Sequence, residues 1–282
     1  MQPGCHGLYC QPFQCPFDGH FIDVARALGQ EFRHAGKYID AVFLQPLSKA
    51  WRACADSVPG QCAVCFSWSR GRICSPCLSR FAATAWRCRS CALRVPEGVT
   101  VCGACIKNPP TFDSALASVD YGHPWDQLIA RFKFNSALDL SSAFADLMVQ
   151  THRASEHAPP DCLLPVPLSA QRLRERGFNQ AWELVRRAGR QLQAKADARL
   201  LLRVIDTPHQ LAFPPARRAA NVRGAFAVEP TRLHEVRDKC ITVIDDVMTT
   251  AATANEIAAV LRQAGAAEVH FWVIARTPRP GE

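Results

Sequence analysis

One stretch decides the fold: Ile241-Thr242-Val243-Ile244-Asp245-Asp246-Val247-Met248-Thr249-Thr250-Ala251-Ala252-Thr253. Its β-branched and aliphatic beginning predicts a buried strand, which runs into two adjacent carboxylates. Small and hydroxyl-bearing residues follow and open a helix that ends at Gly265. A strand that leads into a helix through polar residues is typical of open α/β sheets, where ligands bind beyond the carboxyl ends of the strands.

Strand and helix patterns alternate on both sides of this stretch. Alternating or continuous apolar runs predict strands at 115–121, 162–164, 200–205, 225–228 and 269–274. Apolar residues at helical spacing predict helices over 128–132, 138–148, 181–192 and 257–264. Strands that alternate with helices of this length predict an α/β fold, a mostly parallel sheet with flanking helices.

Length and composition bound the remaining possibilities. The chain has 282 residues, of which 48% are hydrophobic and 21% charged, which is ordinary for a globular protein of about two domains and excludes collagen-like, coiled-coil and wholly disordered chains. No stretch approaches the ~20 apolar residues of a membrane span, and the N-terminus lacks the basic and apolar regions of a secretory signal. We therefore expect a cytoplasmic protein.

The chain divides into three regions of different amino-acid composition. Residues 1–55 carry Cys5, Cys10 and Cys15 at a spacing that lacks paired ligands, and we interpret them as a loosely attached extension, with metal binding as the alternative. Residues 56–109 are rich in cysteine and poor in aliphatic residues, so burial alone cannot hold them together. After the linker at Pro109 and Pro110, residues 110–282 form the predicted α/β domain.

Eight of the 14 cysteines form four Cys-x-x-Cys pairs. The pairs are Cys62/Cys65, Cys74/Cys77, Cys88/Cys91 and Cys102/Cys105. Two such turns facing each other supply a tetrahedral four-sulfur site, so eight thiolates predict two structural zinc ions. Sequential pairing needs only short hairpins and is favoured over an interleaved arrangement. Disulfides are disfavoured in the cytosol, and an iron–sulfur cluster is the lesser alternative.

The residues after the predicted strand at 241–244 have a chemistry of their own. Asp245 and Asp246 are suited to accept hydrogen bonds from a ribose diol, and threonine hydroxyls with free N–H groups at a helix N-terminus suit a phosphate. Together they indicate a ribose 5-phosphate. A magnesium pocket like that of response regulators, with the threonines merely capping the helix, stays open as the alternative.

The same stretch resembles the phosphoribosyl pyrophosphate signature of type I phosphoribosyltransferases, and other segments resemble the ComF (ComF/GntX) family, which is associated with DNA uptake and use. The segments are Arg131-Phe132-Lys133-Phe134, residues 164–169, residues 172–181 with Arg-Gly-Phe-Asn-Gln, and Thr207, Gln210, Arg217, Asn221, Arg223 and Phe226. The cysteine pairs look like the double zinc ribbon of many members. The resemblance covers residues 56–277.

The resemblance implies a type I phosphoribosyltransferase-like domain preceded by a zinc-ribbon module, and a site for phosphoribosyl pyrophosphate with Mg. Residues 165–169 would be the pyrophosphate loop and residues 207–223 a hood from which Arg217 and Arg218 reach the site. The binding residues it implicates are Asp245, Asp246, Thr249, Thr250, Ala251, Ala252, Thr253, Pro167, Leu168 and Ser169. The catalytic residues it implicates are Asp245, Asp246, Arg172 and Arg176.

One residue departs from the family pattern Thr-Thr-Gly-x-Thr: Ala251 stands at the glycine position. The extra methyl group would weaken or reshape the site if this residue needs a positive φ. Whether the chain transfers the ribosyl phosphate to an acceptor therefore stays open.

A non-catalytic function is the alternative. Residues 153–223 hold 13 basic and 6 acidic residues, nearly all of the net charge of +8, and a basic segment implies anionic partners. The zinc ribbons and this segment would then bind single-stranded DNA or a DNA-uptake translocase, with the ribose phosphate pocket as a sensor or relic.

Several candidate residues also have a purely structural interpretation. The arginines at 172, 174 and 176 fit a solvated helix face. Asn179 and Gln180 fit a helix cap. Lys133 fits a packed helix from which the lysine side chain extends to solvent. Trp125, Trp182 and Trp272 are expected in the core or at an interface.

Overall fold

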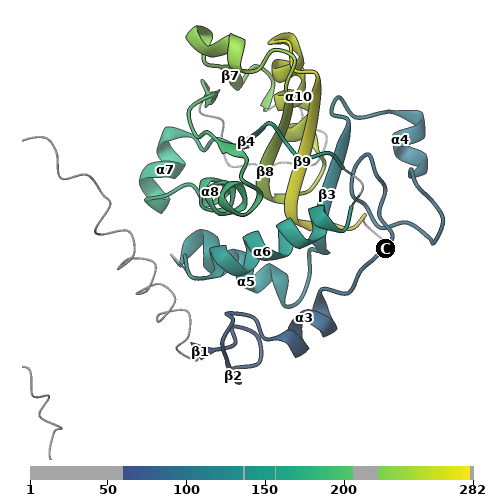
Figure 1. Cartoon of the computed structure of the whole chain (residues 1–282), viewed down its shortest axis with the longest axis vertical. Helices are drawn as coiled ribbons and strands as arrows, with labels where there is room; N and C mark the ends of the chain where they lie inside the picture. Colours follow the sequence, from purple (N-terminus) through teal and green to yellow (C-terminus); the bar gives the residue numbers. More distant parts are fainter. Residues whose placement is uncertain (1–59, 136, 156, 206–221, 280–282) are drawn as a thin grey trace, which may run out of the picture. The chain divides into compact units, whose positions relative to one another are not determined.

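The computed structural model describes residues 60–135, 137–155, 157–205 and 222–279. Its centre is a five-stranded sheet in the order β3-β9-β8-β4-β5, in which every pairing is parallel (Figure 1). The strands are β3 (Ser114–Asp120), β4 (Cys162–Pro165), β5 (Lys195–Ala196), β8 (Cys240–Met248) and β9 (Glu268–Arg276). The predicted α/β fold with a mostly parallel sheet is confirmed, whereas the interpretation of residues 1–55 lies outside the described residues.

The sequence patterns at 200–205 and 225–228 belong to a separate element. They form β6 (Leu201–Arg203) and β7 (Phe226–Val228), an antiparallel pair outside the main sheet. The fifth strand of the sheet is instead β5, two residues that the apolar pattern did not reveal.

Helices cover both faces of the sheet (Figure 1). Helices α5 (Trp125–Phe134), α6 (Leu140–Arg153) and α8 (Gln180–Leu192) lie on one face, and α10 (Ala252–Gln263) lies on the other. The described chain also contains α7 (Ala170–Arg176) and the short 3-10 helix η2 (Pro230–Glu235). Among the described helices, none combines the length and the hydrophobicity that crossing a bilayer requires.

Strand β8 is buried on both sides because its residues alternate between two cores. Ile244, with Leu163 and Trp272, packs in the core that includes residues of α5, α6 and α8. Val243, one position away, packs with residues of α10 in the other core. This explains why all four β-branched residues at 241–244 are buried.

The chain reverses its direction across the sheet between β4 and β8. After β4 it passes through α8 to β5, at one edge, and after β8 it passes through α10 to β9, toward the opposite edge. Such a reversal leaves a crevice at the carboxyl ends of the two central strands. Strand β4 ends at Pro165, opposite Ile244, while β9 accompanies β8 to Met248. Asp245 and Asp246 therefore lie at the crevice. They belong to β8, whereas the sequence suggested that they follow the strand.

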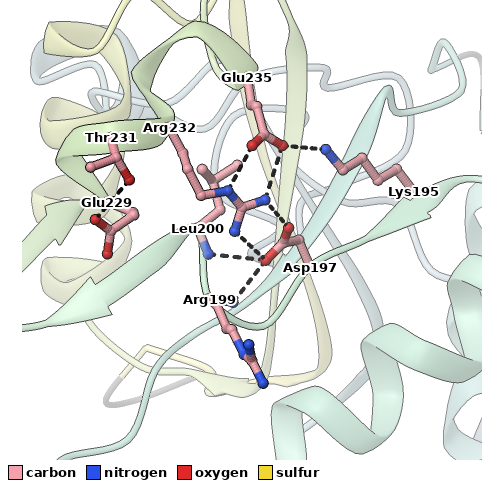
Figure 2. Close-up of polar contacts among 8 residues, drawn as sticks. All are labelled: Lys195, Asp197, Arg199, Leu200, Glu229, Thr231, Arg232 and Glu235. Carbon is pink, nitrogen blue, oxygen red and sulfur yellow. Dashed lines mark hydrogen bonds and ion pairs between the residues drawn. The ribbon is translucent and has the colours of Figure 1, made fainter.

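A charged network anchors the β6–β7 hairpin to the sheet (Figure 2). Arg232 of η2 donates to Asp197, just after β5, and to Glu235, which also pairs with Lys195 of β5. These contacts lower the pKa of Glu235 to about 2, because Arg232 first and Lys195 second stabilise the charged carboxylate. The network thus holds η2 against β5 at the edge of the sheet.

The cysteine-rich module precedes the sheet. Its elements are β1 (Gly60–Gln61), β2 (Trp68–Ser69), α3 (Ser75–Phe81) and α4 (Gly103–Lys107). The part before residue 82 packs against α5, where Trp125 Nε1 donates to the carbonyl of Phe81 over 2.8 Å. The part from residue 87 onward lies against β3, with an ion pair of 2.6 Å between Arg87 and Asp120.

Candidate functional site

The eight paired cysteines form two clusters. In each cluster the four sulfur atoms lie within 4.8 Å of one another. The clusters are Cys62, Cys65, Cys74 and Cys77, and Cys88, Cys91, Cys102 and Cys105, so the sequential pairing is confirmed. The Sγ atoms of Cys65 and Cys74 are 3.6 Å apart, and those of Cys91 and Cys102 3.7 Å. Zinc–sulfur bonds of about 2.3 Å in a tetrahedron place sulfurs about 3.8 Å apart, so both clusters can hold zinc.

Backbone N–H groups prepare these sulfurs for a cation. Cys74 N donates to Cys62 Sγ over 3.3 Å, and Cys102 N donates to Cys88 Sγ over 3.2 Å. Burial opposes ionisation of Cys62, yet backbone donation from residues 64, 65 and 74 lowers its pKa to about 6. A metal would supply the remaining stabilisation that four neighbouring thiolates need.

The two central carboxylates have different surroundings. Asp246 is 3% exposed, and its Oδ1 lies 2.6 Å from Lys133 Nζ of α5. Its Oδ2 accepts a hydrogen bond of 2.9 Å from Gln180 Nε2 of α8. Asp245 is partly exposed, and its Oδ1 accepts from Asp246 N over 2.8 Å. Asp245 therefore retains acceptor capacity toward the crevice, whereas Asp246 is held by two helices.

Burial and neighbouring charges shift the pKa values of Asp245 and Lys133. Burial and then the neighbouring charge of Asp246 raise the pKa of Asp245 to about 7. Burial disfavours the charge on Lys133, but Asp246 outweighs it and raises the lysine pKa. Lys133 and Gln180 are thus both partners of the buried Asp246 carboxylate. The sequence had suggested only a lysine that reaches solvent from a packed helix and a helix cap.

An acceptor remains unpaired beside Asp246. Gln180 is 4% exposed, and its Oε1 has no hydrogen-bond partner among the described residues. Leaving a buried acceptor without a donor costs about 1–3 kcal/mol. A hydroxyl or water donor at this end of the crevice would remove that cost.

The loop between β4 and α7 begins beside β8. Val166 N donates to the carbonyl of Ile244 over 2.9 Å, and Asn179 Nδ2 donates to the carbonyl of Val166 over 3.1 Å. Ser169 caps α7 by accepting from Arg172 N, and Asn179 caps α8 as predicted. These bonds shape the predicted pyrophosphate loop, with Pro167 and Leu168 half-buried in its middle.

Of the arginines on α7, Arg176 comes nearest the carboxylates. Its guanidinium lies 4.9 Å from the ring centre of Phe134, and it interacts electrostatically with Asp246 and Asp245. Burial lowers its pKa, Arg172 lowers it further, and Asp246 and Asp245 oppose this shift. Arg174 is exposed, as the solvated-face interpretation predicts. Lys133 and Arg176 thus form a positive wall beside Asp245 and Asp246.

Helix α10 begins without a side-chain cap. Its N-cap is Ala251, whose φ is 63°, in the left-handed region, and this cap makes no side-chain hydrogen bond. Thr249 and Thr250 just before it are exposed. Ala251 has a positive φ, so the condition under which it reshapes the site is met.

We expect Ala251→Gly to stabilise the protein by about 1 kcal/mol, because a left-handed conformation costs an alanine about 1–2 kcal/mol and glycine entropy offsets part of the gain. Urea unfolding at neutral pH measures the difference. Ala252→Gly, inside the helix, is the control and should destabilise instead. Equal effects of the two substitutions would contradict the strain at residue 251.

Other predicted residues fall elsewhere. Thr207, Gln210, Arg217, Arg218 and Asn221 of the predicted hood lie outside the described residues. Val222 and Ala225, which follow them, are buried, and Gly224 N donates to Glu256 of α10 over 2.6 Å. Trp125 and Trp272 are in the core, as predicted, and Trp182 packs partly buried against it.

A third group of potential ligands, Cys240, Glu268 and His270, lies at the amino ends of β8 and β9. His270 already uses both ring nitrogens, one with Ser114 Oγ at 2.8 Å and one with Glu268 at 3.0 Å. These hydrogen bonds explain why His270 lies close to Glu268, so the group gives no indication of a bound metal ion.

Comparison of the sequence with curated proteins gives similar chains over most of its length. The DNA utilization protein YhgH of Escherichia coli (strain K12) is 30% identical over 228 residues, 78% of this chain and 99% of the relative. YhgH of Salmonella typhimurium is 32% identical over 230 residues, again 78% and 99%. Competence protein F of Haemophilus influenzae is 29% identical over 212 residues, 74% and 92%. No family model matches the chain.

Comparison with solved structures gives partial overlaps. Adenine phosphoribosyltransferase from Leishmania tarentolae is 14% identical, with a TM-score of 0.33 over 60% of this chain and 93% of that one. Glutamine phosphoribosylpyrophosphate amidotransferase from B. subtilis is 20% identical, with a TM-score of 0.32 over 51% of this chain and 30% of that one.

Proposed function

This chain belongs to the ComF family, with relatives named DNA utilization protein YhgH and competence protein F, and from this membership and the geometry of the crevice we propose that it binds phosphoribosyl pyrophosphate together with Mg²⁺. In this proposal Asp245 accepts from the ribose hydroxyls, and the uncapped first turn of α10 binds the 5-phosphate. The pyrophosphate lies over the loop at 165–169. This ligand binding serves the uptake or use of DNA.

One observation carries the proposal: a partly exposed carboxylate and an uncapped helix N-terminus lie at the two ends of the same strand-to-helix connection. Asp245 is three residues before the end of β8, and α10 starts at Ala252. Acceptors at one end and N–H donors at the other match a sugar that carries hydroxyls and a phosphate ester.

The positive wall supports the pyrophosphate position. Arg176 offers a planar fork of donors that suits phosphate oxygens, and Arg172 lies one helical turn before it on α7. Mg²⁺ would be held mainly by the diphosphate, because this ion keeps few protein ligands in such complexes. When bound, it would neutralise part of the charge on the diphosphate.

A DNA-binding function is the second candidate, and one observation favours it. Phe66 and Trp68, on the hairpin of the first cysteine cluster, are 66% and 74% exposed, and Arg70 follows them. Exposed aromatic rings beside a basic side chain suit stacking with unpaired bases. This surface and the sugar site do not exclude each other.

The test is a calorimetric titration with phosphoribosyl pyrophosphate and MgCl₂ at pH 8. We expect Asp245→Asn to weaken binding by about tenfold or more, since a charged acceptor contributes roughly 1.5–3 kcal/mol, while Glu97→Gln, an exposed carboxylate in the cysteine-rich module, binds as the wild type does. Single-stranded DNA is titrated in parallel at two salt concentrations. DNA binding that weakens with salt and survives Asp245→Asn, with no sugar phosphate binding by the wild type, would leave only the second candidate.

The same titration has an expected pH dependence. Because the pKa of Asp245 is raised to about 7, the carboxylate is largely protonated below that pH and loses acceptor strength. Affinity should therefore fall as pH decreases from 8 to 6, by up to about tenfold for each pH unit below the pKa. Asp245→Asn should flatten this part of the profile. A wild-type profile as flat as that of the variant would contradict the role of Asp245.

A further inference from the structure

A buried arginine joins the second cysteine cluster to the ligand loop. Arg276, the last residue of β9, is 5% exposed. Its Nε donates to the carbonyl of Cys91 over 2.8 Å. Its Nη1 donates to the carbonyl of Met248 over 2.9 Å and to that of Thr249. One guanidinium thus contacts a cysteine turn and the first residues of the strand-to-helix connection.

The position of Arg276 follows from the sheet register. Met248 is its partner on β8, so the arginine lies where β8 ends and the loop toward α10 begins. Cys91 is 185 residues away in sequence. The carbonyl of Thr277, at 3.1 Å, is a fourth backbone acceptor of Arg276.

Buried cations are usually paired with negative charge. These backbone acceptors of Arg276 are neutral, and the second cysteine cluster interacts electrostatically with the guanidinium through Cys91 and Cys105. Four thiolates around one divalent ion carry a net charge of −2. Arg279 also reaches this cluster, because its Nη2 lies 3.3 Å from Cys102 Sγ. Two arginines from the end of the chain therefore face a cluster that becomes anionic when it holds a metal.

We propose that the metal-loaded second cluster, acting through Arg276, holds the loop at 248–253 in its binding conformation. Arg276 is a positioning residue: it orients the carbonyls of Met248 and Thr249 and so directs the N–H groups that follow. As a consequence for the site, which rests on the proposed function, phosphoribosyl pyrophosphate binding depends on metal in the second cluster, whereas the first cluster contacts α5 and does not reach this loop through Arg276.

Hydrogen exchange of the full-length, zinc-loaded protein without ligand tests the coupling directly. We expect Arg276→Gln to accelerate exchange in the peptide that covers 248–253 by about tenfold or more, the effect of losing charge-assisted hydrogen bonds. Arg276→Lys keeps the charge, cannot reach all the carbonyls and should give a smaller acceleration. Arg87→Gln is the matched control, because Arg87 donates to the carbonyl of Ala92, next to Cys91, and contacts β3 instead of the loop.

Metal loss provides a second arm. Cys102→Ser with Cys105→Ser should accelerate exchange at 248–253 as Arg276→Gln does, and Cys74→Ser with Cys77→Ser should not. Unchanged exchange in the central residues of β8 and β9 shows that the sheet is folded in each variant. Wild-type exchange at 248–253 in both the Arg276 variants and the second-cluster variant would overturn the proposal, as would equal acceleration by the two cysteine variants.

The result is separable from the proposed function. A wild type that fails to bind phosphoribosyl pyrophosphate refutes that ligand and leaves the exchange result standing. A wild type that binds it, with loop exchange unaffected by Arg276→Gln, refutes the coupling alone.

Discussion

Asp246→Ala should destabilise the protein by about 3 kcal/mol or more, because removing one partner of a buried ion pair leaves the other charge uncompensated. Lys133 Nζ would lose its contact at 2.6 Å, and Gln180 Nε2 its acceptor at 2.9 Å. The lysine side chain is 22% exposed and cannot fully regain water. Urea unfolding at pH 7 measures the loss.

A double substitution separates the ion pair from mere packing. Asp246→Leu with Lys133→Met replaces both charges by apolar groups and should recover most of the stability, as buried ion pairs replaced whole often do. Asp126→Asn, near the start of α5 and away from the pair, should change stability by less than about 0.5 kcal/mol, as expected of surface substitutions. A loss below 1 kcal/mol for Asp246→Ala would contradict the buried pairing.

Removing the metal should unfold the cysteine-rich module and leave the sheet folded. The second cluster has little hydrophobic support: beside the cysteines its core contains Leu93, with Val95 and Val101 packed against it. Structural zinc contributes an apparent 10–16 kcal/mol in small zinc domains at pH 7, which no such core can replace. The sheet has two extensive cores of its own and should persist.

Limited proteolysis with and without a strong zinc chelator checks this expectation. Chelation should open cleavage sites between residues 60 and 109 while a fragment that starts near residue 110 survives. Metal analysis of the untreated protein should give two zinc ions per chain, and Cys77→Ser or Cys105→Ser should each remove one. A module that resists the protease after complete loss of zinc would contradict a structural role for the metal.

Some features were accessible from local sequence because local chemistry alone produces them. Each Cys-x-x-Cys turn brings its two sulfurs together, so the pairs could be read directly, and short connections favoured their sequential grouping. The β-branched run at 241–244 predicted a buried strand, because such residues suit a strand that is covered on both faces. Strand β5 was missed, since two residues with one polar side chain carry no periodic signal.

The chain by itself determined the Cys-x-x-Cys pairs, the alternation of strands and helices that implies a parallel sheet, and the strand-to-helix connection with Ala251 at its centre, because each is a pattern among residues close together in sequence. Only the tertiary structure decided that Asp246 is neutralised by Lys133 and Gln180, and that Arg276 joins Cys91 to Met248. Gln180 is 66 residues from Asp246, and Cys91 is 185 residues from Arg276. Their meeting depends on strand order and register, which place distant side chains together and leave no pattern in the local sequence.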